Sequence, residues 1–227
     1  MRCMRKVAIL GRDREDNQQK ILSFSEPFLT VYLIEDARGY EIKTKTIVLN
    51  LGKHSITVAR GRLNPLSSSV YSNLTIQRAE KLVCVELDAD LARLSSFPFS
   101  NELTHRWQHV HDIFPSAHLK KTRLWRSRKE RVGDAEFNLW FAAAGTNCGI
   151  HNKHDFNEIH TQIYGWGRIQ KFHKNDAKTL CNEVSMGPGY THEPFYDERG
   201  AYPWHQYAAD TDCIWLAVEF YGKTEGH

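Results

Sequence analysis

The sequence of 227 residues predicts a mainly β protein, organised as a sandwich or barrel of short strands. Segments rich in β-branched and aromatic residues recur along the chain with partial alternation of apolar and polar positions, and glycine-bearing turns separate them. Helical periodicity is confined to two short stretches before residue 115. We therefore expect a smaller mixed N-terminal part, followed by a C-terminal part that is almost purely β.

The N-terminal part is expected to contain strands over residues 28–36, 41–50, 54–60 and 81–88. A short helix is expected over residues 89–97, with Asp88 or Asp90 as its cap. A second helix is expected over residues 101–114, with Asn101 as its cap. This helix would bury an apolar stripe made of Leu103, Trp107, Val110 and Phe114.

A boundary is expected near residues 115–121, which divides the chain into an N-terminal region, 1–115, and a C-terminal barrel, 116–227. The basic stretch "KKTRLWRSRKER", residues 120–131, follows it. We interpret this stretch as a solvated linker, with contact to an anion or phosphate as the alternative. Strands are then expected over residues 136–145, 158–172, 180–187 and 212–222.

Composition excludes several classes of protein. No apolar run approaches the roughly 18 residues that span a bilayer, and the first residues lack the hydrophobic region and cleavage site of a secretory signal. The net charge of +3 is too small to indicate nucleic-acid binding, and no phosphate-binding or nucleophile-elbow motif is present. Five widely spaced cysteines indicate free thiols. We therefore expect a cytoplasmic protein that acts on a small molecule and binds neither nucleic acid nor a membrane.

Histidines are concentrated late in the chain, since seven of the twelve lie from His151 onward. Several of them fall in the stretch "GIHNKHDFNEIHTQIYGWGRI", residues 149–169. In a strand, residues two apart share a face, so Glu158, His160 and Gln162 would form a polar face opposite an apolar one. A barrel that holds a ligand or metal would turn this polar face inward.

This stretch resembles the first sequence motif of the cupin superfamily, G-x5-H-x-H-x3-4-E-x6-G. His154, Glu158 and Gly165 have the spacing of its second half. The first cupin histidine should stand where this sequence has Asn152, and His151 is one step out of phase. Either a bulge brings His151 to the site or His160 supplies the missing ligand, and Asn152 is a weaker candidate.

The second cupin motif has a looser counterpart in "PWHQYAADTDCIWLAVEF", residues 203–220, where His205 takes the histidine place. Upstream, His192 follows a glycine-proline turn and also resembles part of this motif. The resemblance covers residues 136–222 and implies a cupin-type jelly-roll barrel. The N-terminal strands would permit a second, degenerate barrel, as in bicupins, and pairing of edge strands would permit a homodimer.

The resemblance implies a divalent transition metal held by His154, Glu158, His160 and His205. Fe is the metal that this mixed ligand set suits best, with Zn, Mn, Ni and Co as alternatives. The implied activity is a metal-dependent reaction on a small polar organic substrate, and an Fe(II)-type dioxygenase is favoured. The alternatives are a non-oxidative isomerase or lyase, in which Glu158 or His192 moves a proton, and a cupin that binds a small molecule without turnover.

Overall fold

The computed structural model describes residues 17–26, 28–87, 107–152, 154–196 and 201–221, and these residues are mainly β. The N-terminal strands are β1 (Gln19–Ile21), β2 (Leu29–Ile42), β3 (Thr46–Asn50), β4 (Ile56–Val58), β5 (Gly61–Leu63), β6 (Ser68–Tyr71) and β7 (Leu74–Leu87). The C-terminal strands are β8 (Trp107–His109), β9 (Leu124–Ser127), β10 (Glu130–Val132), β11 (Ala135–Ala142), β12 (Asn157–Tyr164), β13 (Gly167–Phe172), β14 (Leu180–Met186), β15 (Trp204–Ala209) and β16 (Cys213–Phe220). The helical segments are α1 (Val110–Ile113), η2 (Leu119–Lys121) and η3 (Ala177–Thr179).

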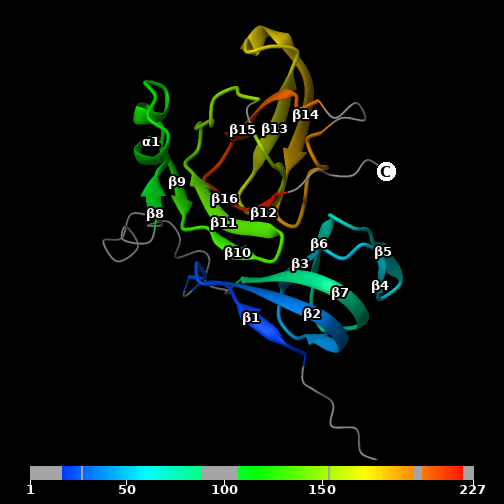
Figure 1. Cartoon of the computed structure of the whole chain (residues 1–227). Helices are drawn as coiled ribbons and strands as arrows, with labels where there is room; N and C mark the ends of the chain where they lie inside the picture. Colours follow the sequence, from blue (N-terminus) through cyan, green and yellow to red (C-terminus); the bar gives the residue numbers. More distant parts are fainter. Residues whose placement is uncertain (1–16, 27, 88–106, 153, 197–200, 222–227) are drawn as a thin grey trace, which may run out of the picture.

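The strands form three main sheets that lie one above another (Figure 1). The N-terminal sheet has the order β1-β2-β7-β3-β6, and the separate hairpin β4-β5 lies beside it. The large sheet has the order β12-β16-β11-β9-β8, with β10 added to β11, and the small sheet has the order β14-β13-β15. The large sheet is the middle layer, because one apolar core joins it to the N-terminal sheet and another joins it to the small sheet.

The C-terminal strands are paired as in a jelly roll. Strand β12 pairs with β16 along almost its whole length, and the next strand, β13, pairs with β15. The hairpin β12-β13 thus pairs antiparallel with the hairpin β15-β16. The strands β12 and β16 lie in the large sheet, and β13 and β15 lie in the small sheet that faces it. Single bridges extend both sheets, since His151 pairs with His205 and Thr161 pairs with Thr191. The jelly-roll fold that the sequence predicts is therefore confirmed.

Alternation of side chains along the large sheet separates a wall of the barrel from an outer apolar face. On β12, Ile159 and Ile163 pack in the core shared with the N-terminal sheet, whereas Glu158 and His160 line the cavity of the barrel. The polar face of β12 is thus turned inward, as a ligand-binding barrel requires. Since the N-terminal sheet covers the apolar face, every residue of β16 from Cys213 to Glu219 is buried.

The prediction of a helix over residues 101–114 is wrong for residues 107–114, which are the part that the structure describes. Trp107–His109 form β8, which pairs with β9, and α1 is a single turn. Trp107 and Val110 are buried as the stripe requires, but Phe114 is 51% exposed. Sheet pairing overrides the local periodicity here. The helix expected over residues 89–97 lies outside the described residues, as does Leu103.

Trp107–Ile113 belong structurally with the C-terminal strands, because β8 is the edge of the large sheet and Val110 packs in the core of the barrel. The division of the chain near residue 115 stays a prediction. Apolar side chains such as Tyr32, Ile56 and Leu82 pack together between the N-terminal sheet and the β4-β5 hairpin. Among the described residues, the only cluster of potential metal ligands lies in the barrel. Within the same residues, no helix has the length and apolar character needed to cross a membrane.

Candidate metal centre and substrate cavity

Three histidines meet at one end of the barrel. His151, His154 and His205 each offer one ring nitrogen, and these nitrogens lie within 4.8 Å of one another. The Oε1 atom of Glu158 lies 3.8 Å from Nε2 of His154 and 3.7 Å from Nε2 of His205. Three imidazoles and one carboxylate at this spacing form a group that can hold a divalent transition metal.

Backbone pairing brings these side chains together from separate parts of the sequence. The backbone N–H of His151 donates to the carbonyl of His205 at 3.0 Å, and the N–H of His205 donates back at 2.9 Å. This bridge places the two imidazole centroids 4.4 Å apart. His154 follows three residues after the bridge, and Glu158 lies near the start of β12. The rigid part of the site therefore consists of β12, β15 and the segment that pairs with β15.

Hydrogen bonds fix the tautomers of two of these imidazoles. Nδ1 of His151 donates to the carbonyl of Gly149 at 2.8 Å, and Nδ1 of His205 donates to the carbonyl of Pro203 at 3.0 Å. In both rings Nε2 is left with its lone pair available as a ligand. Nε2 of His154 is buried and has no hydrogen-bond partner among the described residues. Such an orphaned nitrogen beside the other two fits a metal ligand better than a core histidine.

The electrostatics of the cluster favour a cation. Burial lowers the pKa of His154 to about 4 and also lowers the pKa of His205, so both rings are neutral near pH 7. Burial by itself would raise the pKa of Glu158, but its interactions with His160 and His205 outweigh this effect and hold the pKa well below its ordinary value. The buried, ionised carboxylate of Glu158 thus lies beside the neutral rings of His154 and His205, a combination that attracts a divalent ion.

Two neighbours hold the carboxylate of Glu158 in place. Nε2 of His160 lies 3.1 Å from its Oε2, and the hydroxyl of Tyr202 donates to its Oε1 at 3.1 Å. The structure thus places His160 behind the carboxylate and outside the group of three histidines. These contacts fit a positioning role for His160, and its expected role as a metal ligand stays a prediction.

His151 joins the cluster although it is one step out of phase with the cupin motif. Strand β12 begins only at Asn157, so the alternation of a strand does not govern residues 151–154. The bridge to His205 sets the direction of His151 instead. This is the arrangement in which His151 fills the place that Asn152 leaves vacant in the motif.

His192 has both ring nitrogens occupied by backbone groups. Its Nδ1 donates to the carbonyl of Glu193 at 2.6 Å, and its Nε2 accepts the backbone N–H of His160 at 2.9 Å. Burial lowers the pKa of His192 to about 3, which keeps this arrangement neutral. A ring held in this way supports β12 and has no nitrogen available to move a proton. The catalytic role expected for His192 stays a prediction, and these hydrogen bonds do not support it.

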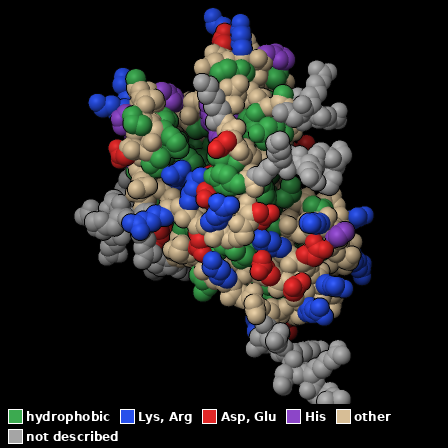
Figure 2. Space-filling view, in the orientation of Figure 1, with side chains coloured by type: hydrophobic (Ala, Val, Ile, Leu, Met, Phe, Trp, Pro, Cys, Tyr) green, Lys and Arg blue, Asp and Glu red, His purple; other side chains and the backbone are tan. Residues whose placement is uncertain are grey.

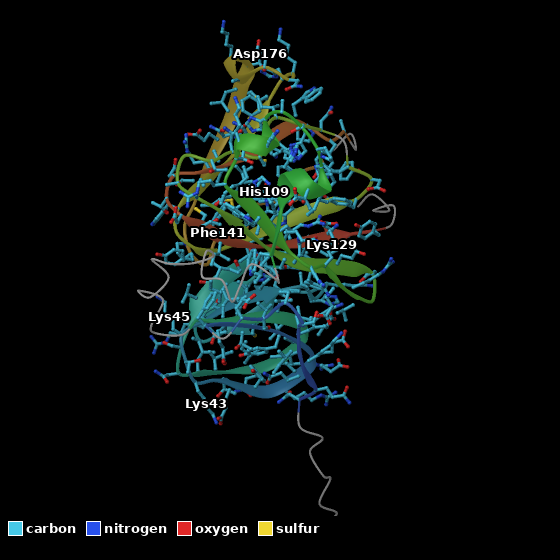
Figure 3. All side chains as sticks on the ribbon, turned by 90° about the vertical axis from the view of Figure 1, so that its left-hand side faces the viewer. Lys43, Lys45, His109, Lys129, Phe141 and Asp176 are labelled. Carbon is cyan, nitrogen blue, oxygen red and sulfur yellow. The ribbon has the colours of Figure 1, made fainter. Side chains whose placement is uncertain are left out.

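The histidine cluster opens into a cavity of about 950 Å³ inside the barrel. Its wall is largely aromatic, and its lining includes Phe114, Trp140, Phe156, Tyr207 and Trp215. Figure 2 shows the surface hollowed between the α1 segment and the strands of the small sheet, with hydrophobic side chains in the recess. Asp176, at the rim, lies at the tip of the molecule opposite Lys43 and Lys45 of the N-terminal part (Figure 3). The cavity therefore extends toward the end of the molecule that lies away from Lys43.

The basic stretch at residues 120–131 is only partly a solvated linker. It contains η2, β9 and part of β10, and it contributes Arg126 and Lys129 to the cavity wall. Lys129 is paired with Glu219 and lies 3.4 Å from Glu136. Sequence reasoning could not find these two side chains as cavity residues, because the charge run by itself does not say which of its members point inward.

Comparisons with known proteins give likenesses to cupins at low identity. No protein-family model matches the chain, and no curated protein does. A cupin 2 conserved barrel domain protein from Leptotrichia buccalis is 9% identical, with a TM-score of 0.37 over 91% of this chain and 89% of that one. A cupin superfamily protein from Desulfitobacterium hafniense is 11% identical, with a TM-score of 0.35 over 44% of this chain and 79% of that one.

A sugar phosphate isomerase of the cupin superfamily from Silicibacter pomeroyi is 17% identical, with a TM-score of 0.34 over 44% of this chain and 60% of that one. At these values the assignment of the fold rests on the strand pairing within this chain. That pairing makes the C-terminal part a double-sheet jelly roll, with the histidine cluster at one end of the barrel.

Proposed function

We propose that this protein is a metal-dependent enzyme of the cupin type, which acts on a small polar organic substrate and consumes dioxygen. The observation that carries the proposal is the group of His151, His154, His205 and Glu158, whose imidazole nitrogens and ionised carboxylate lie close together at one cavity. Mixed imidazole and carboxylate ligands with open positions suit Fe(II). Such an ion, when bound, would supply a site at which dioxygen and substrate are activated together.

The residues around the group support this chemistry, because they orient the carboxylate of Glu158 and keep water away from His205. Tyr202 and His160 hold the carboxylate of Glu158 in one orientation. Phe195 packs 4.1 Å, centroid to centroid, from the ring of His205 and shields it from water. A closed apolar surrounding of this kind protects reactive intermediates from hydrolysis.

The contacts of Glu158 and His192 favour the oxidative reaction over the isomerase or lyase alternative. A proton-shuttling base needs a pKa near the working pH and a free lone pair facing the substrate. Glu158 is held by two donors and its pKa is well below the ordinary value, whereas both nitrogens of His192 are occupied. Neither residue meets these requirements.

The test is reconstitution with Fe(II) under anaerobic conditions, followed by measurement of bound metal and of oxygen uptake with a panel of small organic acids, phenols and sugars. We expect close to one metal ion per chain, and oxygen uptake that depends on one class of substrate. Metal binding without oxygen uptake, together with conversion of a substrate under nitrogen, would favour the isomerase or lyase. A chain that retains no Fe, Mn, Zn, Ni or Co would contradict the proposal.

A further inference from the structure

A row of unsatisfied donors crosses the wall of the cavity beside the histidine cluster. Arg126 on β9 lies opposite Trp140 on β11, and Trp140 lies opposite Trp215 on β16. The three side chains all line the cavity. Nε of Arg126 and the indole Nε1 atoms of both tryptophans are buried and have no hydrogen-bond partner among the described residues. Each of these groups can only donate a hydrogen bond.

Buried donors without partners are rare, because each loses its hydrogen bonds to water and gains none in return. Three of them in one row on a cavity wall indicate that a ligand supplies the acceptors. The fourth position of the row is Gln162, opposite Trp215, and its amide is already bonded to Tyr207 and to the backbone at Tyr164. The unsatisfied part of the row therefore ends at Trp215.

Arg126 in this row has no close ion-pair partner among the described residues, although Glu219 and Glu136 attract it from a greater distance. Arg126 and Lys129 are the basic residues that line the cavity, and Lys129 is paired with Glu219 and Glu136. In the described part of the chain, no carboxylate lies within 4 Å of the Arg126 guanidinium to form an ion pair. The guanidinium is held by aromatic rings instead, 5.6 Å from the centroid of Phe114 and 5.7 Å from that of Trp140.

Stacking fixes the direction of the guanidinium and leaves its edge available. An arginine with a free edge in a partly dry site prefers a carboxylate, which it binds through two parallel hydrogen bonds. The neighbouring rings of Trp140 and Trp215 are parallel, with an interplanar angle of 4° and centroids 5.9 Å apart. The two rings are stacked on each other, and Arg126 and Tyr207 cover their outer faces, so neither ring has a free face for a ligand. What the pair offers next to the anion position is its two unpartnered indole N–H groups.

We propose that Arg126 binds the carboxylate of the substrate and that the substrate is an organic acid with a further hydrogen-bond acceptor next to its carboxylate. This inference deepens the proposed function and rests on it, because only an enzyme has a substrate. The further acceptor would meet the indole N–H groups of Trp140 and Trp215, and the other end of the acid would reach the group of His151, His154 and His205. Arg126 is thus a specificity-determining residue, supplied by the basic stretch whose role the sequence left open.

Benzoate and benzamide are suitable probes, because they have nearly the same shape and differ in charge. Their binding is measured by calorimetry and by the fluorescence of the cavity tryptophans, in protein freed of metal by a chelator and in protein loaded with Zn. The metal-free measurement matters because a carboxylate could also bind the metal. We expect wild type to bind benzoate at least about tenfold more tightly than benzamide in both forms.

The variant Arg126→Gln should weaken benzoate binding about tenfold or more and leave benzamide within about twofold. Arg126→Lys should keep part of the preference, because it retains the charge but loses the planar fork. The matched control is Arg128→Gln, which removes the same charge from an exposed position two residues away. Circular dichroism and metal content should be unchanged in all three variants.

Equal binding of the two probes to wild type overturns the inference, as does an unchanged preference in Arg126→Gln or an absence of binding at millimolar concentrations. The result of this binding test is independent of the result of the metal-binding test. A protein that retains no metal but prefers benzoate through Arg126 would refute the proposed function and keep the carboxylate site. A protein that binds metal but binds benzoate and benzamide equally would refute the carboxylate site and keep the proposed function.

Discussion

At the scale of single residues, the tautomers of the histidines separate the ligands from the supporting groups. His151 and His205 use Nδ1 for a backbone carbonyl and keep Nε2 free. His192 uses both nitrogens for the backbone, and His160 uses one for the carboxylate of Glu158. The buried His192 and His205 thus differ in their capacity to bind a metal, and the hydrogen-bond partners of each ring decide this capacity.

The variant His151→Ala tests the register of the site. We expect it to weaken metal binding more than about 100-fold, as His154→Ala and His205→Ala should, because each removes a ligand atom. Metal content after gel filtration and a competition titration with a chelator measure the effect. The exposed His173 is the control, since His173→Ala should retain the metal. If His151→Ala retains the metal and His160→Ala loses it, His160 is the ligand and His151 lies outside the metal site.

The variant Tyr202→Phe tests the positioning of the carboxylate. It removes only the hydroxyl that donates to Glu158, so metal affinity should fall about tenfold while the fold is preserved. The control is Tyr196→Phe, because the ring of Tyr196 packs against Tyr202 with centroids 4.8 Å apart. Competition titrations on both variants give the comparison. Equal affinities for the two would show that the hydroxyl of Tyr202 does not hold the ligand.

At the scale of elements, the turn between β12 and β13 keeps the ligand-bearing strand in register. Gly165 has a φ of +70°, and a Cβ added there would lie 1.9 Å from the carbonyl oxygen of Asp212. Only glycine fits such a position, because it needs both the left-handed conformation and space for a neighbouring backbone. The glycine at the end of the first motif thus permits the close approach of this turn to the start of β16.

The variant Gly165→Ala should destabilise the protein by at least about 3 kcal/mol, since it adds a backbone clash to the conformational strain. Gly145→Ala is the matched control, because Gly145 also has a positive φ, +76°, but has no atom within 4 Å of an added Cβ. It should cost only about 1–2 kcal/mol, which is the strain by itself. Denaturant unfolding of both variants separates the two contributions. Equal losses of stability would mean that the backbone at Asp212 moves aside.

At the scale of the whole molecule, the large sheet is covered on one face by the N-terminal sheet and lines the cavity with the other. Leu139 and Leu216 are fully buried on its outer side, in the core shared with Val31 and Val83 of the N-terminal sheet. Its inner side forms the cavity wall. The N-terminal half therefore completes the apolar packing of the strands that bear the site, and the two halves should unfold together.

The variant Leu139→Ala should lower the free energy of unfolding by about 2–5 kcal/mol and leave a single transition for the whole chain. The control is Leu180→Ala, since Leu180 is 44% exposed and its loss should change stability little. Unfolding is followed by tryptophan fluorescence, which reports on the C-terminal part because all six tryptophans lie after residue 106, and by far-ultraviolet circular dichroism, which reports on the whole chain. Transitions at different denaturant concentrations for the two signals would show that the halves unfold independently.

Most strands could be predicted from the sequence, because their apolar residues follow the period of a pleated sheet. The strand over β12 and the strand over β16 illustrate this, since both were expected to begin within about two residues of their observed starts. The helix expected before residue 115 failed, because its period-four stripe also suits a short strand followed by one turn. The choice between a helix and a strand depends on whether a partner strand is available, and local periodicity carries no information about that partner.

The sequence by itself determined the class of the fold and the polar face of β12, because side-chain alternation is a local property. Its resemblance to the cupin motifs predicted a site built around His154, Glu158 and His205. The tertiary structure decided that the polar face of β12 points into the barrel. Only the tertiary structure decided that His151 joins the cluster, that both nitrogens of His192 are occupied, and that Arg126 faces the cavity. Each of these depends on hydrogen bonds or strand pairings between residues far apart in the chain, which no local pattern encodes.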